Sequence, residues 1–134
     1  MDTINVPYIN LATSHAPLKD ELLSAVARVI DHGMFVMGDE VAEFEHRFAE
    51  LCEVRYAVGV NSGTDALIMA LEVLGVGPGD EVILPAQTFV ASGLSILMTG
   101  AKPVFADIQY ETGNIDHKTI KERMRFKTAT FLKL

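Results

Sequence analysis

Five consecutive small or polar residues near the middle of the chain have the composition of a phosphate-binding turn. They are Asn61, Ser62, Gly63, Thr64 and Asp65. The hydroxyls of Ser62 and Thr64 can bond phosphate oxygens, and Gly63 lets the backbone approach a ligand closely. Where such a turn opens a helix, unpaired N–H groups and the helix dipole favour an anion. The same residues equally fit a helix that is merely capped by Ser62 or Thr64.

Two further residues could share a site with this turn because each follows a predicted strand. Phe89 comes shortly after the apolar run 81–84, and Asp107 ends the run 102–107. Ligands of open α/β sheets bind beyond the carboxyl ends of the strands. Phe89 could present its ring to a flat ligand there, or it could be a core residue under the following helix. An acidic residue in the position of Asp107 is more often a turn or cap residue than a catalytic one.

The elements that must position these residues are apolar strands that alternate with apolar helices. The predicted strands are 55–60, 81–84 and 102–107, and the predicted helices between them are 64–74 and 88–98. Strands separated by helices in this way indicate right-handed parallel crossovers. Helices that cover such a sheet explain why the strands are continuously apolar. The predicted fold class is therefore α/β, three-layered, with a parallel βαβαβ core.

The residues before this core show helical periodicity. Apolar residues recur at helical spacing over 18–32, and Gly33 suits a left-handed helix cap. A short extended piece is expected at 34–37. A second helix should follow Gly38, with an apolar stripe formed by Val41, Phe44, Phe48 and Leu51. We accordingly expect an N-terminal helical segment, 1–54, and a second part, 55–134, that carries the sheet.

Several classes of function do not fit the sequence. The formal net charge of −7 argues against nucleic-acid binding, which usually needs a basic face. A single cysteine, Cys52, excludes an internal disulfide framework and a zinc site made of cysteines. The spacings of a Walker loop and of a dinucleotide fingerprint are absent, and the four histidines are scattered. The longest apolar runs are far shorter than the roughly 20 residues of a membrane span. The start lacks the pattern of a signal peptide, so a cytoplasmic location is expected.

Several segments, taken in order, resemble the DegT/DnrJ/StrS family of sugar aminotransferases that depend on pyridoxal 5′-phosphate (PLP). The first are 35–38 (FVMG) and 41–49, in which Val41, Phe44-Glu45 and Phe48-Ala49 have the family's spacing. Residues 56–67 (YAVGVNSGTDAL) resemble the family's phosphate-binding segment. Residues 77–91 (GPGDEVILPAQTFVA) are similar to its ring-stacking segment, and 100–108 resemble the strand that follows. Because order and spacing hold throughout, the resemblance is more specific than any one motif.

The resemblance implies a fold and a set of cofactor contacts. It implies the large domain of a fold type I PLP enzyme, in which Gly63 and Thr64, with Ser62 and Asp65 beside them, hold the cofactor phosphate. It implies that Phe89 stacks on the pyridine ring. Family members move an amino group, usually from glutamate, to a keto sugar carried on a nucleotide, and they form homodimers. The cofactor acts as the electron sink, while the protein orients it.

The chain also departs from the family's pattern. None of its lysines fits the family's lysine motif, so we expect the Schiff-base lysine beyond residue 134 and assign no catalytic residue in this chain. After Asp116 the sequence drifts where the family continues into another strand. The chain alone is therefore expected to be inactive and poorly soluble. Two alternatives stay open: a non-catalytic remnant or partner-docking fragment, and a sugar dehydratase of the same fold.

Overall fold

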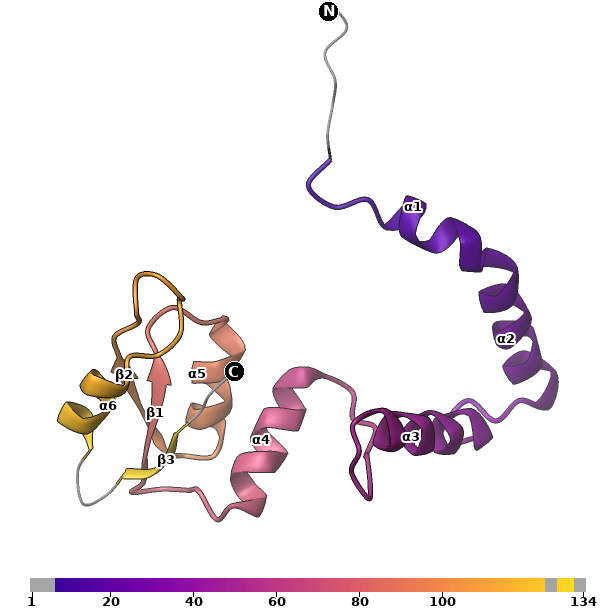
Figure 1. Ribbon diagram of the computed structural model, residues 1–134. Coiled ribbons are helices and arrows are strands. Elements are labelled where there is room, and N and C mark those ends of the chain that lie inside the picture. Colours follow the sequence, from indigo (N-terminus) through magenta and orange to yellow (C-terminus); the bar gives the residue numbers. More distant parts are fainter. Residues whose placement is uncertain (1–6, 125–127, 132–134) are drawn as a thin grey trace, which may run out of the picture. The chain divides into compact units, whose positions relative to one another are not determined.

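The computed structural model describes residues 7–124 and 128–131, and these form parts of two compact units. The first unit is Met1–Gly59 and the second is Val60–Leu134, and each is described by itself below. The expectations for the first residues of the chain, and for Lys127 and Lys133, lie outside the described residues. Helices α1 to α3 belong to the first unit, and the strands of the described residues belong to the second (Figure 1).

The first unit is helical, as its periodicity predicted. Its elements are α1 (Leu11–His15), the 3₁₀ turn η1 (Ala16–Leu18), α2 (Lys19–His32) and α3 (Asp39–Leu51). Helix α2 ends at Gly33, whose φ of 71° is left-handed and whose N–H donates to the Val29 carbonyl at 2.9 Å. The predicted glycine cap is therefore confirmed. The apolar stripe of α3 is also present, and the rings of Phe44 and Phe48 lie 5.6 Å apart.

The connection between α2 and α3 is a tight hydrogen-bonded turn. His32 Nε2 lies 3.0 Å from Glu40 Oε1, and the Met34 N–H donates to His32 Nδ1 at 3.1 Å. A Cβ on Gly38 would lie 3.0 Å from the Met34 carbonyl oxygen, so a larger residue there would have to displace Met34. The expectation of an extended piece over 34–37 is wrong at Met37, which has a φ of +52°. Met37 therefore takes a left-handed conformation inside the turn that the His32–Glu40 contact spans.

The pair formed by His32 and Glu40 makes a testable electrostatic prediction. The hydrogen bond from His32 lowers the pKa of Glu40 below its usual value of 4.5. A carboxyl group whose pKa is lower in the folded state than in the unfolded state stabilises the fold at pH values above its unfolded-state pKa. This stabilisation is lost as the pH falls through the folded-state pKa. His32→Ala should therefore move the titration midpoint of Glu40 upward, toward 4.5. Carbon-13 NMR of the Glu40 carboxyl group measures the shift, and an unchanged midpoint would contradict the pairing.

The second unit contains a small parallel sheet. Its elements are α4 (Gly63–Val73), β1 (Glu81–Pro85), α5 (Val90–Met98), β2 (Lys102–Ala106), α6 (His117–Arg123) and β3 (Thr128–Phe131). The strand order is β2-β1-β3, and both pairings are parallel. Ile83 is opposite Val104 on one side of β1 and opposite Phe131 on the other. The chain thus forms the predicted parallel βαβαβ core, although with one different strand.

The two crossovers place helices on opposite faces of the sheet. The chain passes from β1 to β2 through α5, and then returns across β1 to β3 through α6. Because both crossovers are right-handed, opposite directions of travel put α5 and α6 on opposite faces. Figure 1 shows them on either side of the strands, and α4 packs beside α5. This arrangement is the predicted three-layer α/β class.

Two predictions about the strands are wrong. Residues 55–60 form no strand, although their pattern is apolar; Tyr56 and Val58 are 78% and 79% exposed. A strand needs backbone hydrogen bonds to a neighbour, and residues 55–60 pair with none of the three strands of the sheet. The N–H of Gly59 instead donates to Glu45 Oε1 at 2.7 Å. Conversely, β3 occupies the region after Asp116 where the sequence was expected to drift from the strand pattern.

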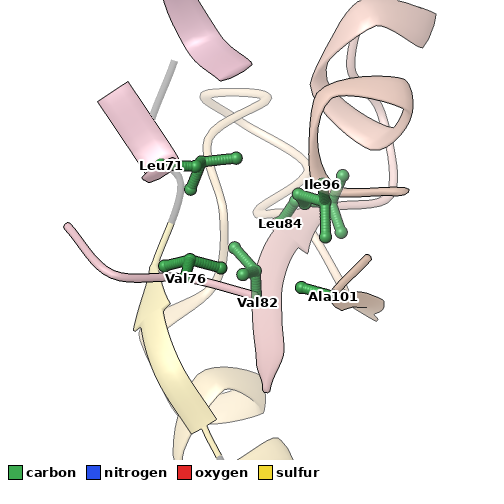
Figure 2. Packing of buried hydrophobic residues seen from close by; sticks show 6 residues of the cluster. All are labelled: Leu71, Val76, Val82, Leu84, Ile96 and Ala101. Atoms are coloured by element: carbon green, nitrogen blue, oxygen red, sulfur yellow. The ribbon is translucent and has the colours of Figure 1, made fainter. Parts of the chain in front are cut away.

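One hydrophobic cluster holds the second unit together (Figure 2). Its members come from α4, from the turn after α4, from β1, from α5 and from the connection between α5 and β2: Leu71, Val76, Val82, Leu84, Ile96 and Ala101. Val82 and Leu84 alternate along β1 and share one face, whereas Ile83 between them is fully buried on the other. Burial on both faces fixes β1 as the central strand that positions the helix starts described next.

Among the described residues, no helix has the length and apolar character needed to cross a membrane.

Candidate functional site

Helix α4 begins at the predicted phosphate-binding turn, and Ser62 is its N-cap. Ser62 has an extended backbone, with φ −156° and ψ 158°, and its Oγ accepts the N–H of Asp65 at 3.1 Å. The same hydroxyl donates to Asp65 Oδ2 at 2.6 Å. The capped-helix alternative is therefore correct for Ser62. A cap uses only one of the first N–H groups of the helix, so it leaves room for an anion beside it.

Gly63 and Thr64 supply the groups that an anion could use. In the part of the chain that the structure describes, neither of their N–H groups has an acceptor. Gly63 is exposed, and a Cβ added to it would meet nothing within 4 Å. Thr64 is half-buried, and its hydroxyl belongs to the residue next to Gly63 in the first turn. Unpaired donors at the positive end of a helix of 11 residues form a local site for negative charge.

Asp65 has a different part in this turn. Its carboxylate accepts the Ser62 hydroxyl, and an ionised carboxylate has no proton to donate to a phosphate oxygen. The geometry therefore gives Asp65 the task of holding the cap and of complementing the helix dipole. A direct contact between Asp65 and a phosphate, which the family resemblance implies, stays a prediction.

Phe89 lies at the start of the next helix, α5, and its ring faces solvent. The residue is the N-cap of α5, with φ −66° and ψ 143°, and its side chain is 77% exposed. The alternative of a core phenylalanine is therefore wrong in this structure. Figure 1 shows that α4 and α5 both begin at the edge of the sheet where β1 ends. The phosphate-type turn and the exposed ring consequently lie at the same edge.

An apolar groove of about 450 Å³ lies beside the ring. It runs between α5 and β2, and its lining includes Phe89, Val90, Leu94, Leu97 and Phe105. The groove offers apolar contact to a ring-shaped ligand but few polar groups. Specific polar recognition must therefore come from the α4 turn rather than from the groove itself.

Asp107, the third candidate, is a turn residue. Its Oδ1 accepts the N–H of Ile108 at 2.8 Å, and its carbonyl accepts the N–H of Asp116 at 2.8 Å. These bonds close the connection between β2 and α6, as expected for an acidic residue at a strand end. Over the described ranges, 7–124 and 128–131, no group of His, Cys, Asp and Glu is arranged to hold a metal ion.

The sequence analysis missed one polar contact at this edge of the sheet. Thr88 Oγ1 lies 2.8 Å from Ser92 Oγ, and Ser92 is only 1% exposed. The signal available in the sequence was the spacing of four between two hydroxyl residues across a predicted helix start. That spacing is common, and only the burial of Ser92 makes it informative.

The fold and this edge define a class of protein: an α/β protein with a Ser-capped helix start and an exposed phenylalanine at the start of the next helix. The model of the DegT/DnrJ/EryC1/StrS aminotransferase family matches residues 17–133, and the chain belongs to this family. The match runs past Asp116, so the expectation that the resemblance ends there is wrong. The missed strand, β3, lies inside the matched range.

Individual relatives agree with this assignment. The chain is 41% identical over 131 residues to dTDP-3-amino-3,4,6-trideoxy-alpha-D-glucose transaminase of Streptomyces venezuelae. The match covers 98% of this chain and 35% of that protein. The crystal structure of S. venezuelae DesV in complex with a ketimine intermediate matches with a TM-score of 0.90 at 42% identity, over 94% of this chain and 34% of that one.

A third comparison extends the range of reactions among the relatives. The structure of GDP-4-keto-6-deoxymannose-3-dehydratase, with a trapped PLP–glutamate adduct, matches with a TM-score of 0.75 at 32% identity. That match covers 83% of this chain and 30% of the dehydratase chain. The fold is thus that of part of the large domain of PLP-dependent transferases. The chain spans about a third of the length of these relatives.

Proposed function

We propose that this chain forms the cofactor-phosphate part of a PLP-dependent aminotransferase that acts on a nucleotide-linked keto sugar, with glutamate as the amino donor. The observation that carries the proposal is the start of α4, where Gly63 and Thr64 offer unpaired N–H groups in open space. The relatives that act on nucleotide sugars support the substrate class.

The residues at this edge of the sheet fit the cofactor. A phosphate dianion matches the two N–H groups, the Thr64 hydroxyl and the positive helix end, because all of them favour negative charge. The exposed ring of Phe89 and the apolar groove beside it match the flat, largely apolar pyridine ring. When bound, PLP supplies the electron sink of the reaction. The residues of this chain bind its phosphate, set the plane of its ring and exclude water from one ring face.

The proposal places the Schiff-base lysine in a longer protein that contains this segment. That lysine, the substrate contacts and the choice between amino transfer and dehydration are assigned to residues other than the candidates described here. The dehydratase of the same fold is the second candidate function, because a PLP-containing structure of that class matches this chain. Both candidates require the same phosphate contacts, so the experiment below tests what they share.

The longer enzyme is proposed to be a homodimer. Within the first unit, α2 and α3 carry apolar stripes whose side chains are exposed, including Leu22, Val26, Phe44 and Phe48. Contiguous exposed apolar stripes on amphipathic helices are typical of protein–protein interaction surfaces. A non-catalytic fragment that docks on a partner through these stripes is the alternative, and it predicts no cofactor binding by this chain.

Removal of the Thr64 hydroxyl should weaken phosphate-dependent ligand binding. The suitable probe is pyridoxamine 5′-phosphate, because it has no aldehyde and cannot react with surface lysines. Hydrogen bonds to charged groups contribute more than neutral ones, so Thr64→Ala should lower the affinity about tenfold to a hundredfold. Thr64→Ser keeps the hydroxyl and should keep most of the affinity. Titration of the probe's own fluorescence with each variant measures the dissociation constants.

Two controls separate the phosphate site from general effects. Pyridoxamine without phosphate should bind far more weakly than the phosphorylated probe, and equally to all three proteins. Thermal unfolding should be nearly the same for Thr64→Ala and Thr64→Ser, since Thr64 is not in the core. Equal binding of the two probes to the unmodified chain would refute the phosphate site.

A further inference from the structure

The start of α5 has an unusual N-cap residue. The N-cap position favours Ser, Thr, Asp or Asn, whose side chains accept an N–H of the first turn. Here the position holds Phe89, which makes no side-chain cap bond and is 77% exposed. A large apolar side chain at this position stabilises neither the helix nor the core. Departures from local preference of this kind are typical of functional positions.

A pair of hydroxyls links the residue before this N-cap to the first turn of α5. Thr88 precedes the N-cap, and its Oγ1 lies 2.8 Å from the Oγ of Ser92, in the first turn of α5. Ser92 is 1% exposed, and Ser95, which is fully buried, donates its hydroxyl to the Ser92 carbonyl at 3.0 Å. Ser92 is therefore the buried member of the pair, whereas Thr88 is half-buried at the start of the helix. A buried partner makes the position of Thr88 well defined.

This geometry constrains the backbone on both sides of Phe89. Pro85 is buried at the end of β1, and the Ala86 N–H donates to the Ala106 carbonyl at 2.9 Å. After the ring, the Ser92 N–H donates to the Phe89 carbonyl at 3.0 Å. The bond between Thr88 and Ser92 is the side-chain contact that spans Phe89 itself. It links the residue before Phe89 to the first turn of α5.

We infer that Thr88, through Ser92, is a positioning residue that holds the Phe89 ring at the carboxyl edge of the sheet, ready to stack on a flat ligand. The inference rests on the proposed function for its ligand, the pyridine ring of PLP. Its structural part concerns the protein alone and can be tested without any ligand. Thr88 touches neither the phosphate nor the reacting atoms in this assignment; it acts through its neighbour.

The matched variants are Thr88→Val and Thr88→Ser. Valine has the shape of threonine but removes the hydroxyl and leaves the buried Ser92 Oγ without its partner, whereas serine keeps the bond. A second removal variant, Ser92→Ala, takes away the buried hydroxyl and leaves Thr88 at a half-buried position where water can satisfy it. Ser92→Ala thus tests the same link without creating an orphaned buried group, should Thr88→Val fail to fold.

The first measurement is made on the ligand-free chain. NMR relaxation of the Phe89 backbone and ring should show increased mobility in Thr88→Val and in Ser92→Ala, and mobility close to the original in Thr88→Ser. The second measurement is the affinity for pyridoxamine 5′-phosphate, which the loss of one neutral hydrogen bond should lower about threefold to tenfold in the two removal variants. Unchanged mobility of Phe89 in Ser92→Ala would overturn the inference, whatever the affinities are.

The two proposals fail in different ways. If the unmodified chain binds the phosphorylated and unphosphorylated probes equally, the proposed function fails, and the relaxation data still decide whether Thr88 positions the ring. If the unmodified chain prefers the phosphorylated probe but the removal variants match it in mobility and affinity, the phosphate site stands and the positioning role of Thr88 is wrong.

Discussion

Replacing Ile96 with alanine should destabilise the second unit by about 2–5 kcal/mol, the range for large-to-small changes in a packed core. Ile96 is fully buried and belongs to the cluster that joins α4, β1 and α5. Alanine would leave a cavity beside Leu84 in this cluster (Figure 2). Since whole domains are stable by only about 5–15 kcal/mol, a loss at the upper end would unfold the unit. Chemical denaturation followed by circular dichroism measures the change.

The neighbouring residue provides a matched control. Leu97 follows Ile96 in α5 but is 56% exposed, so Leu97→Ala removes a side chain of the same volume from the surface. Alanine is also the better helix former, so the change should be about 0.5 kcal/mol or less in either direction. Similar losses for the two variants would mean that α5 is rotated from the orientation described here.

Gly100→Ala should cost about 2–3 kcal/mol, because two penalties coincide at this residue. Its φ of +81° is a left-handed conformation that side chains disfavour, and a Cβ would lie only 3.0 Å from Pro78 Cγ. Gly100 ends α5 and leads directly into the buried Ala101 and then β2. Movement that relieves the contact with Pro78 would therefore shift a core residue. Thermal unfolding of the purified variant measures the loss.

Gly113 separates the two penalties. Its φ of +68° is similar, but nothing lies within 4 Å of a Cβ built on it. Gly113→Ala should therefore show the backbone penalty alone, about 1–2 kcal/mol. If Gly100→Ala and Gly113→Ala had equal effects, the contact with Pro78 would be contributing nothing.

Much of the fold could be predicted because its signals are local. Helices α2 and α3 follow from apolar spacing, and the left-handed end of α2 follows from Gly33. The strands β1 and β2, and the helix between them, follow from continuous apolar runs bounded by Pro85 and Gly100. Each of these features is decided by residues within a few positions of one another.

The errors concern contacts between distant residues. Residues 55–60 form no strand and 128–131 do, because a strand depends on pairing with a distant segment, which neither local pattern specifies. The sequence predicted Ser62 to Asp65 and Phe89 as candidate site residues, but it did not predict the separate contacts that each of them makes. The bond between Ser62 and Asp65 and the exposure of Phe89 both depend on the packing of the helix starts. Neither is visible in residue types alone.

The central place of β1 also affects the order in which the chain can fold during synthesis. Both strands that pair with β1 come after it in the sequence, as do Ile96 and Ala101 of its core. When β1 leaves the ribosome, its backbone groups and the apolar side of α4 have no partners yet. The pairing of β1 can begin only once β2 has emerged, and its other edge is paired only after β3 has emerged. Until then residues 60–101 are open to chaperones and to misassociation.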